Sequence, residues 1–242
     1  MVFEPRTYRD KMTARGLISF QVTSKETDLW IAAKKNLKDL ASSTLIKIRE
    51  ELEAYIKSNA NFKESYIPVE VPETAPLVVR MMAKGAKKAG VGPMAAVAGA
   101  IAEIIGKKIL EESEEVIVEN GGDIFLKSKI IRKIAVYAGK SKWNEKVALI
   151  IKPEQTPLGI CTSSGTVGHS LSFGKSDAVI VISKETAFAD AEATALGNRI
   201  KKEEDVEKVI EMGKKIKEVE GLLIIVGEKL GAWGNVEIEP LS

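Results

Sequence analysis

The segment 186–199, with the sequence TAFADAEATALGNR, constrains the fold more than any other part of this chain. Asp190 and Thr194 lie four residues apart, so in a helix both side-chain oxygens project from one face. Most of their neighbours are alanine, phenylalanine or leucine, and such small apolar residues imply that the helix is buried. A buried carboxylate needs hydrogen-bond donors or a cation. The segment therefore predicts a buried helix with a metal site, whereas the simpler alternative is that Asp190 only caps a helix.

Two further segments combine small residues with oxygen donors where a hydrophobic run ends, at 120–123 (NGGD) and 162–165 (TSSG). Glycine lets backbone amides approach a ligand closely, and such amides suit phosphate. A carboxylate and a hydroxyl suit Mg²⁺, which takes its other ligands from water and substrate phosphates. The alternatives are an ordinary hairpin turn and an ordinary polar loop. The candidate ligand-binding residues in these segments are Gly121, Gly122, Asp123, Thr162, Ser163, Ser164 and Gly165.

The hydrophobic periodicity predicts an α+β chain of antiparallel strands with long helices packed on one face. We expect all 242 residues to form a single domain, since the only candidate boundary is a short proline-containing connector at 68–76. The predicted helices are 37–57, 75–89, 94–112, 186–199 and 203–217. The predicted strands are 14–23, 28–33, 116–119, 124–127, 133–137, 147–151, 179–183, 222–226 and 236–239.

Charge and composition exclude several classes of function. The 36 basic and 34 acidic residues leave a net charge of only +2, which gives no case for nucleic-acid binding. The longest apolar stretch, 94–105, is too short to span a membrane and contains Glu103. The N-terminus lacks the apolar core of a signal peptide, so we expect a cytoplasmic protein without a membrane partner. One cysteine, Cys161, forms no internal disulfide and is interpreted as structural.

The single histidine, His169, is the candidate general acid or base. It follows Ser164 by five residues, and no acidic residue lies at a spacing that indicates a catalytic triad, so the sequence does not favour a serine hydrolase. The alternative for His169 is a solvated or structural loop residue. A histidine-rich zinc site is excluded because there is no second histidine.

Taken in order, three of these motifs resemble the ApbE-type family, the Mg²⁺-dependent FAD:protein FMN transferases. That family carries a G-G-D-I loop, a downstream T-S-G and an A-D-A-x-A-T-A helix. The matching segments here are 121–124 (GGDI), 162–165 (TSSG) and 189–195 (ADAEATA). The resemblance covers residues 93–198, and the first ninety residues contain no matching motif.

The resemblance implies an α+β architecture with antiparallel sheets, related to the tunnelling fold. It implies that Asp190 and Thr194 are side-chain ligands of Mg²⁺, with a carbonyl from a helical region as a third ligand. It also implies that the loops at 121–123 and 162–165 line the site of FAD.

The chain departs from the family at two places. The family's K-G-x-x-x-D helix aligns with 98–103, so the lysine is replaced by Ala98 and the aspartate by Glu103, which we retain as a cofactor-binding candidate. The family's H-x-I-D-P-x-T-G segment is absent, and only His169 remains of it. The sequence most resembles a divergent cytoplasmic branch of the family.

Three hypotheses follow. The first is a Mg²⁺-dependent enzyme that acts on a flavin dinucleotide or a related pyrophosphate-linked nucleotide, as an FMN transferase with a protein acceptor or as an FAD hydrolase. The second is a flavin- or nucleotide-binding protein that keeps the fold without the transferase chemistry. The third is a structural or interaction protein. Helices rich in small residues are also compatible with a homodimer.

Overall fold

The computed structural model describes residue 9 and residues 14–165 and 174–241. Its main feature is an eight-stranded antiparallel sheet with the strand order β1-β2-β3-β4-β7-β8-β9-β10. A three-stranded antiparallel sheet has the order β11-β6-β5. The strands of the large sheet are β1 (Ile18–Ser24), β2 (Thr27–Ala33), β3 (Val116–Asn120), β4 (Asp123–Lys127), β7 (Leu158–Ser163), β8 (Ala178–Ser183), β9 (Gly221–Val226) and β10 (Lys229–Gly234). Those of the small sheet are β5 (Arg132–Ala135), β6 (Val147–Ile151) and β11 (Glu237–Pro240).

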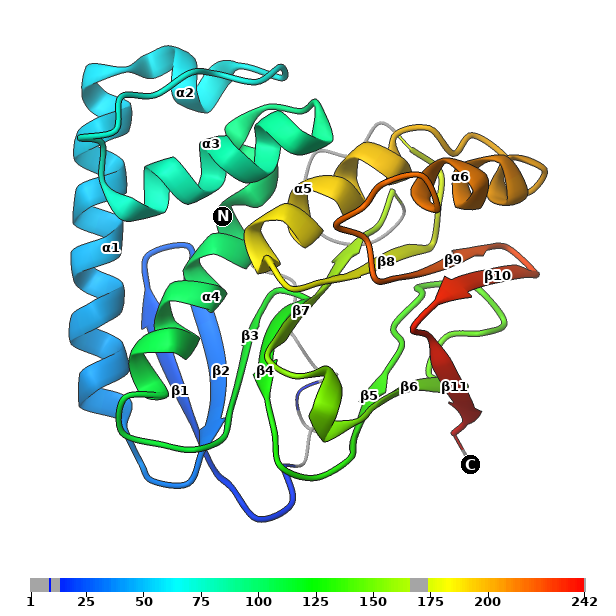
Figure 1. Ribbon diagram of the computed structural model, residues 1–242, viewed down its shortest axis with the longest axis horizontal. Helices are drawn as coiled ribbons and strands as arrows, with labels where there is room; N and C mark the ends of the chain where they lie inside the picture. Colours follow the sequence, from blue (N-terminus) through cyan, green and yellow to red (C-terminus); the bar gives the residue numbers. More distant parts are fainter. Residues whose placement is uncertain (1–8, 10–13, 166–173, 242) are drawn as a thin grey trace.

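Helices cover one face of the large sheet and the small sheet lies against the other (Figure 1). This arrangement confirms the predicted α+β class with helices on one face. The described helices are α1 (Lys38–Ser58), α2 (Ala60–Glu64), α3 (Leu77–Ala89), α4 (Val97–Ile109), α5 (Thr186–Gly197) and α6 (Asp205–Gly213), with short 3₁₀ segments η2 (Pro93–Ala96) and η3 (Pro153–Gln155).

The central strands are apolar on both faces because both faces are covered. In β8, Val179 and Val181 pack with α5 and α6. The alternate residues Ile180 and Ile182 pack in a second core that contains residues of the small sheet. The whole strand is buried, which explains its continuous hydrophobic sequence.

The structure differs from the sequence prediction in a few elements. Two strands were missed: β7, which carries part of the segment predicted as a polar loop, and β10. Both contain glycine, and their residues lack a clear apolar and polar alternation. The helix predicted at 94–112 is divided into η2 and α4, and a short α2 follows α1.

In the described part of the chain, no single helix is long and apolar enough to cross a membrane. The helices Leu77–Ala89 and Pro93–Ile109 meet the length and composition criteria only when taken together, across a bend of 105°. The cytoplasmic location stays a prediction.

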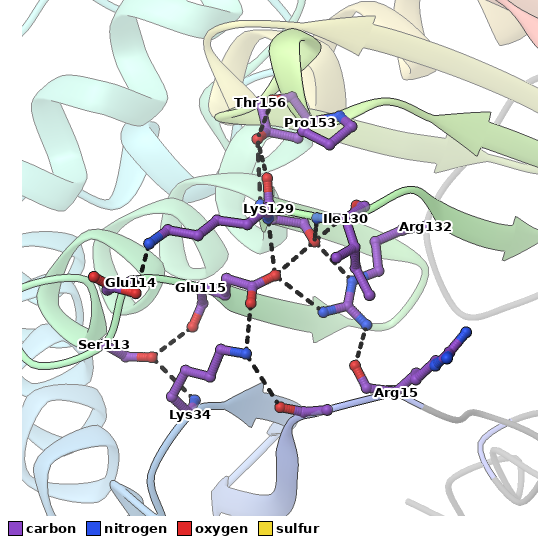
Figure 2. Close-up of polar contacts among 12 residues, drawn as sticks. Arg15, Lys34, Ser113, Glu114, Glu115, Lys129, Ile130, Arg132, Pro153 and Thr156 are labelled. Atoms are coloured by element: carbon purple, nitrogen blue, oxygen red, sulfur yellow. Dashed lines mark hydrogen bonds and ion pairs between the residues drawn. The ribbon is translucent and has the colours of Figure 1, made fainter.

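A buried ionic network holds the start of β3 to neighbouring segments (Figure 2). The side chain of Glu115 is 2% exposed, and its Oε1 pairs with Lys34 Nζ at 2.7 Å. Its Oε2 accepts hydrogen bonds from the Ser128 hydroxyl and the Lys129 amide, both at 2.8 Å, and lies 3.2 Å from Arg132 Nη2. Burial alone raises the pKa of Glu115, but Lys34, the Lys129 amide and Ser128 outweigh burial and lower that pKa to about 2.

This network predicts a loss of stability in acid. The pKa of Glu115 lies below its ordinary value of 4.5, so the stabilisation is complete above that value and is lost as the pH falls toward about 2. A shift of this size corresponds to about 3 kcal/mol. We expect the free energy of unfolding, measured with urea between neutral pH and about pH 2, to fall in that window.

Glu115→Gln removes the titrating group, so the variant should lose this part of the pH dependence and be less stable at neutral pH. Glu114→Gln is the matched control, because Glu114 is an exposed neighbour that pairs with Lys129 at 2.6 Å. Equal pH profiles for the Glu115 variant and the unmodified protein would contradict the assignment.

Candidate functional site

The helices α4 and α5 cap each other's N-termini with carboxylates. Asp190 of α5 accepts a hydrogen bond from the Gly99 amide, in the first turn of α4, at Oδ2 with a distance of 2.8 Å. Glu103 of α4 accepts from the amides of Thr186 and Ala187, at the start of α5, at 2.8 and 3.4 Å. Neither helix has a side-chain cap at its own N-cap position. Since a helix N-terminus favours negative charge and leaves amides unpaired, each helix fixes the position of the other.

Glycine allows this close crossing. A Cβ atom at Gly99 would lie 2.5 Å from the Thr186 carbonyl oxygen and 2.8 Å from Asp190 Cβ. Both distances are shorter than van der Waals contact. The small residues of α4 therefore serve tight packing, and they also bring the α4 N-terminus to Asp190.

The hairpin between β3 and β4 also contacts the first turn of α4. Asn120 and Asp123 pair across a two-residue turn of Gly121 and Gly122, whose φ angles are 66° and 103°. The Asn120 side-chain Nδ2 donates to the Ala98 carbonyl at 3.1 Å, and Asp123 Oδ1 accepts from the Thr162 amide at 3.2 Å. The turn is thus an ordinary hairpin turn that is also held against α4 and β7.

The segment Thr162–Gly165 extends from this point toward the end of α5. Gly165 donates its amide to the Ser176 carbonyl at 2.9 Å, and Ser164 donates its hydroxyl to the same oxygen at 3.5 Å. Ser163 is buried, and its hydroxyl lies 3.4 Å from the position of a Cβ on Gly197, the last residue of α5. The segment therefore lies along α5, with Thr162 at the Asp123 end.

Two amides that the sequence analysis assigned to phosphate already have acceptors in the protein. The Gly122 amide donates to Glu119 Oε1 at 2.8 Å, and the Gly165 amide donates to Ser176. The glycine at 122 is instead needed for its φ of 103°.

Asp123, which is buried, and Asp190, which is half-buried, form a pair of acidic side chains. Burial raises the pKa of Asp190 to about 7, although the amides of Gly99 and Ala98 oppose the increase. Burial also raises the pKa of Asp123 well above its ordinary value, and the charge of Asp190 adds to the effect. None of the hydrogen bonds and ion pairs found for these two carboxylates among the described residues comes from lysine or arginine. A cation at this position would compensate their charge.

The remaining predicted residues are placed as follows. Thr194 is half-buried one helical turn after Asp190. Glu103 is occupied at both oxygens, by the α5 N-terminus and by Lys107 Nζ at 2.5 Å, so its role in cofactor binding stays a prediction. Burial, followed by the charges of Asp123 and Asp190, raises the pKa of the Cys161 thiol, which agrees with a structural cysteine. His169 lies outside the described residues.

Asn120 and Gly99 are not among the site residues predicted from the sequence. Asn120 belongs to the NGGD motif, so the motif itself contained the signal. Gly99 stood out only as one of several small residues in α4, and its role depends on the crossing with α5.

Comparison with known proteins gives one family. A family model described as "AbpE bacteria" matches residues 9–232. A UPF0280 protein of Methanocaldococcus jannaschii is 42% identical over 222 residues, covering 89% of this chain and 90% of the relative. A UPF0280 protein of Methanosarcina barkeri is 42% identical over 215 residues, covering 88% and 85% of the two chains.

Solved structures share the fold. The ApbE protein of Thermotoga maritima superposes with a TM-score of 0.60 at 14% identity, covering 89% of this chain and 96% of the other. The apo form of the Pseudomonas stutzeri flavinyl transferase ApbE gives a TM-score of 0.57 at 14% identity, covering 90% and 93%. At this level of identity the similarity concerns the fold, and it confirms the predicted architecture.

The helix crossing yields a stability prediction. Gly99→Ala should destabilise the protein by about 1–3 kcal/mol, because the new methyl group must push α4 away from Thr186 and Asp190. Urea unfolding measures the effect. Gly197→Ala is the matched control: it lies in α5, and its nearest neighbour would be 3.4 Å from the added Cβ. If the two variants proved equally stable, the crossing would not depend on Gly99.

Proposed function

The chain belongs to the family described as "AbpE bacteria", and on that premise we propose that it is a divalent-metal-dependent enzyme acting on a flavin dinucleotide or a related pyrophosphate-linked nucleotide. The observation that carries the proposal is the convergence of Asp190, Asp123 and the turn at 121–122 at the N-terminus of α4. The Pseudomonas stutzeri protein, which has this fold, is named a flavinyl transferase. We expect the same substrate class here.

The chemistry of the site suits a hard divalent cation. Among the described residues, no group of three or more histidine, cysteine, aspartate or glutamate side chains could hold a metal. Mg²⁺ does not require such a group, because it binds through one or two carboxylates together with water and substrate phosphates. Asp190 and Thr194 would hold the ion, and a cation is favoured because the neighbouring carboxylates of Asp190 and Asp123 have no lysine or arginine partner among the described residues. When bound, the ion would stabilise negative charge on the phosphate oxygens.

The protein's own residues would orient the ligand. Asp190 is held by the Gly99 amide, so its carboxylate is fixed before any ligand arrives. The Gly121–Gly122 turn and Thr162 form one continuous surface, because a Cβ on Gly122 would lie 4.0 Å from Thr162 Cβ. Glycine at this position leaves that surface free of a side chain. We therefore place the pyrophosphate beside this turn and the α4 N-terminus.

A second candidate is a flavin- or nucleotide-binding protein without transferase activity. It is favoured by Ala98, which replaces the family's lysine, and by Glu103, whose carboxylate is engaged at the N-terminus of α5. Transfer of FMN from FAD to a protein acceptor releases AMP, and hydrolysis of FAD gives FMN and AMP. A carrier would bind FAD and release neither product.

Calorimetric titration with FAD, in Mg²⁺ and then in EDTA, tests the proposal. We expect binding that depends on Mg²⁺, with AMP formed from bound FAD. Binding without AMP would identify a carrier. An absence of FAD binding in Mg²⁺ would refute the flavin function.

Asp190→Asn should weaken Mg²⁺-dependent FAD binding by about 10-fold or more, since an amide is a poor ligand for Mg²⁺. Asp205→Asn is the matched control, because Asp205 also accepts backbone amides, from Lys201 and Lys202, but lies in α6 away from the site. The same loss of binding in both variants would argue against a metal at Asp190.

Thr194 can be tested by a hydroxyl series. Thr194→Val keeps the shape and removes the oxygen, so FAD binding in Mg²⁺ should weaken by about 10-fold. Thr194→Ser restores the hydroxyl and should recover most of the affinity. If the valine variant bound FAD as tightly as the serine variant, Thr194 would not be a ligand.

A further inference from the structure

Besides its contacts with α4 and β7, the Gly121–Gly122 turn is held by Glu119, and Glu119 is in turn held by Arg9. Glu119, in β3, is 1% exposed, and its Oε1 accepts a hydrogen bond from the Gly122 amide at 2.8 Å. Its other oxygen, Oε2, accepts from Arg9 Nε at 2.7 Å and lies 2.6 Å from Arg9 Nη2. One carboxylate therefore joins the turn to Arg9, which is 110 residues away in sequence.

Arg9 is itself fixed. Its side chain is 5% exposed, and Nη1 donates to Asp28 Oδ2 at 2.8 Å while Nη2 donates to the Asp28 carbonyl at 2.9 Å. Asp28 lies in β2, the strand next to β3. The planar guanidinium thus spans two strands, which an ammonium group could not do with the same geometry.

The removal of Arg9 would leave the Glu119 carboxylate buried without this partner. A carboxylate that loses a charged hydrogen-bond partner is held less firmly in its orientation. This change weakens the hold of Glu119 on the Gly122 amide, and both glycines of the turn have high backbone freedom. The turn would then lose one of its three attachments, the other two being Asn120 to α4 and Asp123 to β7.

We propose that Arg9 is a positioning residue of the nucleotide site, acting through Glu119 to fix the Gly121–Gly122 turn in its ligand-binding shape. The inference rests on the proposed function in one respect, namely that a nucleotide binds beside this turn. The effect of Arg9 on the conformation of the turn does not depend on any ligand.

The chain offers a matched control at the opposite end of β3. Arg132 and Glu115 form a second buried ion pair, with side chains 6% and 2% exposed, in the network described above. This pair flanks the same strand but does not contact the turn. Arg9→Gln and Arg132→Gln therefore remove comparable buried arginines, and only the first should affect the nucleotide site.

Two measurements on the full-length variants test the proposal. Hydrogen exchange of the Gly122 amide, without ligand, should be about 10-fold faster in Arg9→Gln than in the unmodified protein and unchanged in Arg132→Gln. FAD titration in Mg²⁺ should show about 10-fold weaker binding for Arg9→Gln alone. Glu119→Gln keeps a side-chain oxygen that can accept the Gly122 amide. The Gly122 amide should therefore exchange more slowly in Glu119→Gln than in Arg9→Gln.

The outcomes separate this inference from the proposed function. Unchanged Gly122 exchange in Arg9→Gln would overturn it, as would equal losses of FAD affinity in the two arginine variants. If the unmodified protein did not bind FAD, the flavin function would fail, and faster Gly122 exchange confined to the Arg9 variant would still support the control of the turn. Should Arg9→Gln not fold, Arg9→Lys keeps the charge and should show an intermediate exchange rate; a normal rate would contradict the role of the guanidinium.

Discussion

The exchange of carboxylates between α4 and α5 is the interaction on which the candidate site depends. Each helix begins inside the protein, where unpaired amides cost about 1–3 kcal/mol each. Asp190 supplies an acceptor to α4 and Glu103 supplies one to α5, and Gly99 lets the two backbones come close enough. The acidic side chain that the sequence marks as a metal ligand is therefore also part of the packing. Its position is set by the helix crossing before a ligand binds.

The large sheet brings the other motifs to this crossing. β4 and β7 pair directly, with Ile124 opposite Ile160, although the connection between them includes the whole of β5 and β6. This pairing puts Asp123 beside the Thr162 amide. The small sheet and the helices cover the two faces of the large sheet, and the candidate site lies on the helical side. Burial explains why the pKa values of both aspartates are raised.

Buried ion pairs flank β3 at its two ends, and they serve different parts of the molecule. Glu115 and Arg132 tie the strand to the connection between β4 and β5. Glu119 and Arg9 tie it to β2 and to the glycine turn. Replacing such pairs by apolar residues often costs little stability, so a role in fixing geometry is the better explanation for the pair that holds the glycine turn.

The sequence by itself determined the elements whose signal is local. Helical spacing gave α1, α3, α4 and α5, the glycine pair gave the β3–β4 turn, and the order of three motifs gave the family. It did not give β7 and β10, because glycine and polar residues interrupt their alternation. Nor did it give the engagement of Glu103 with α5 or the contact of Arg9 with Glu119, which join residues 83 and 110 positions apart. Periodicity reports only what neighbouring residues prefer, whereas these contacts exist because strand pairing and helix crossing bring distant segments together. The tertiary structure alone decided that Asp190 accepts the first-turn amide of α4 and that Glu103 accepts the first amides of α5.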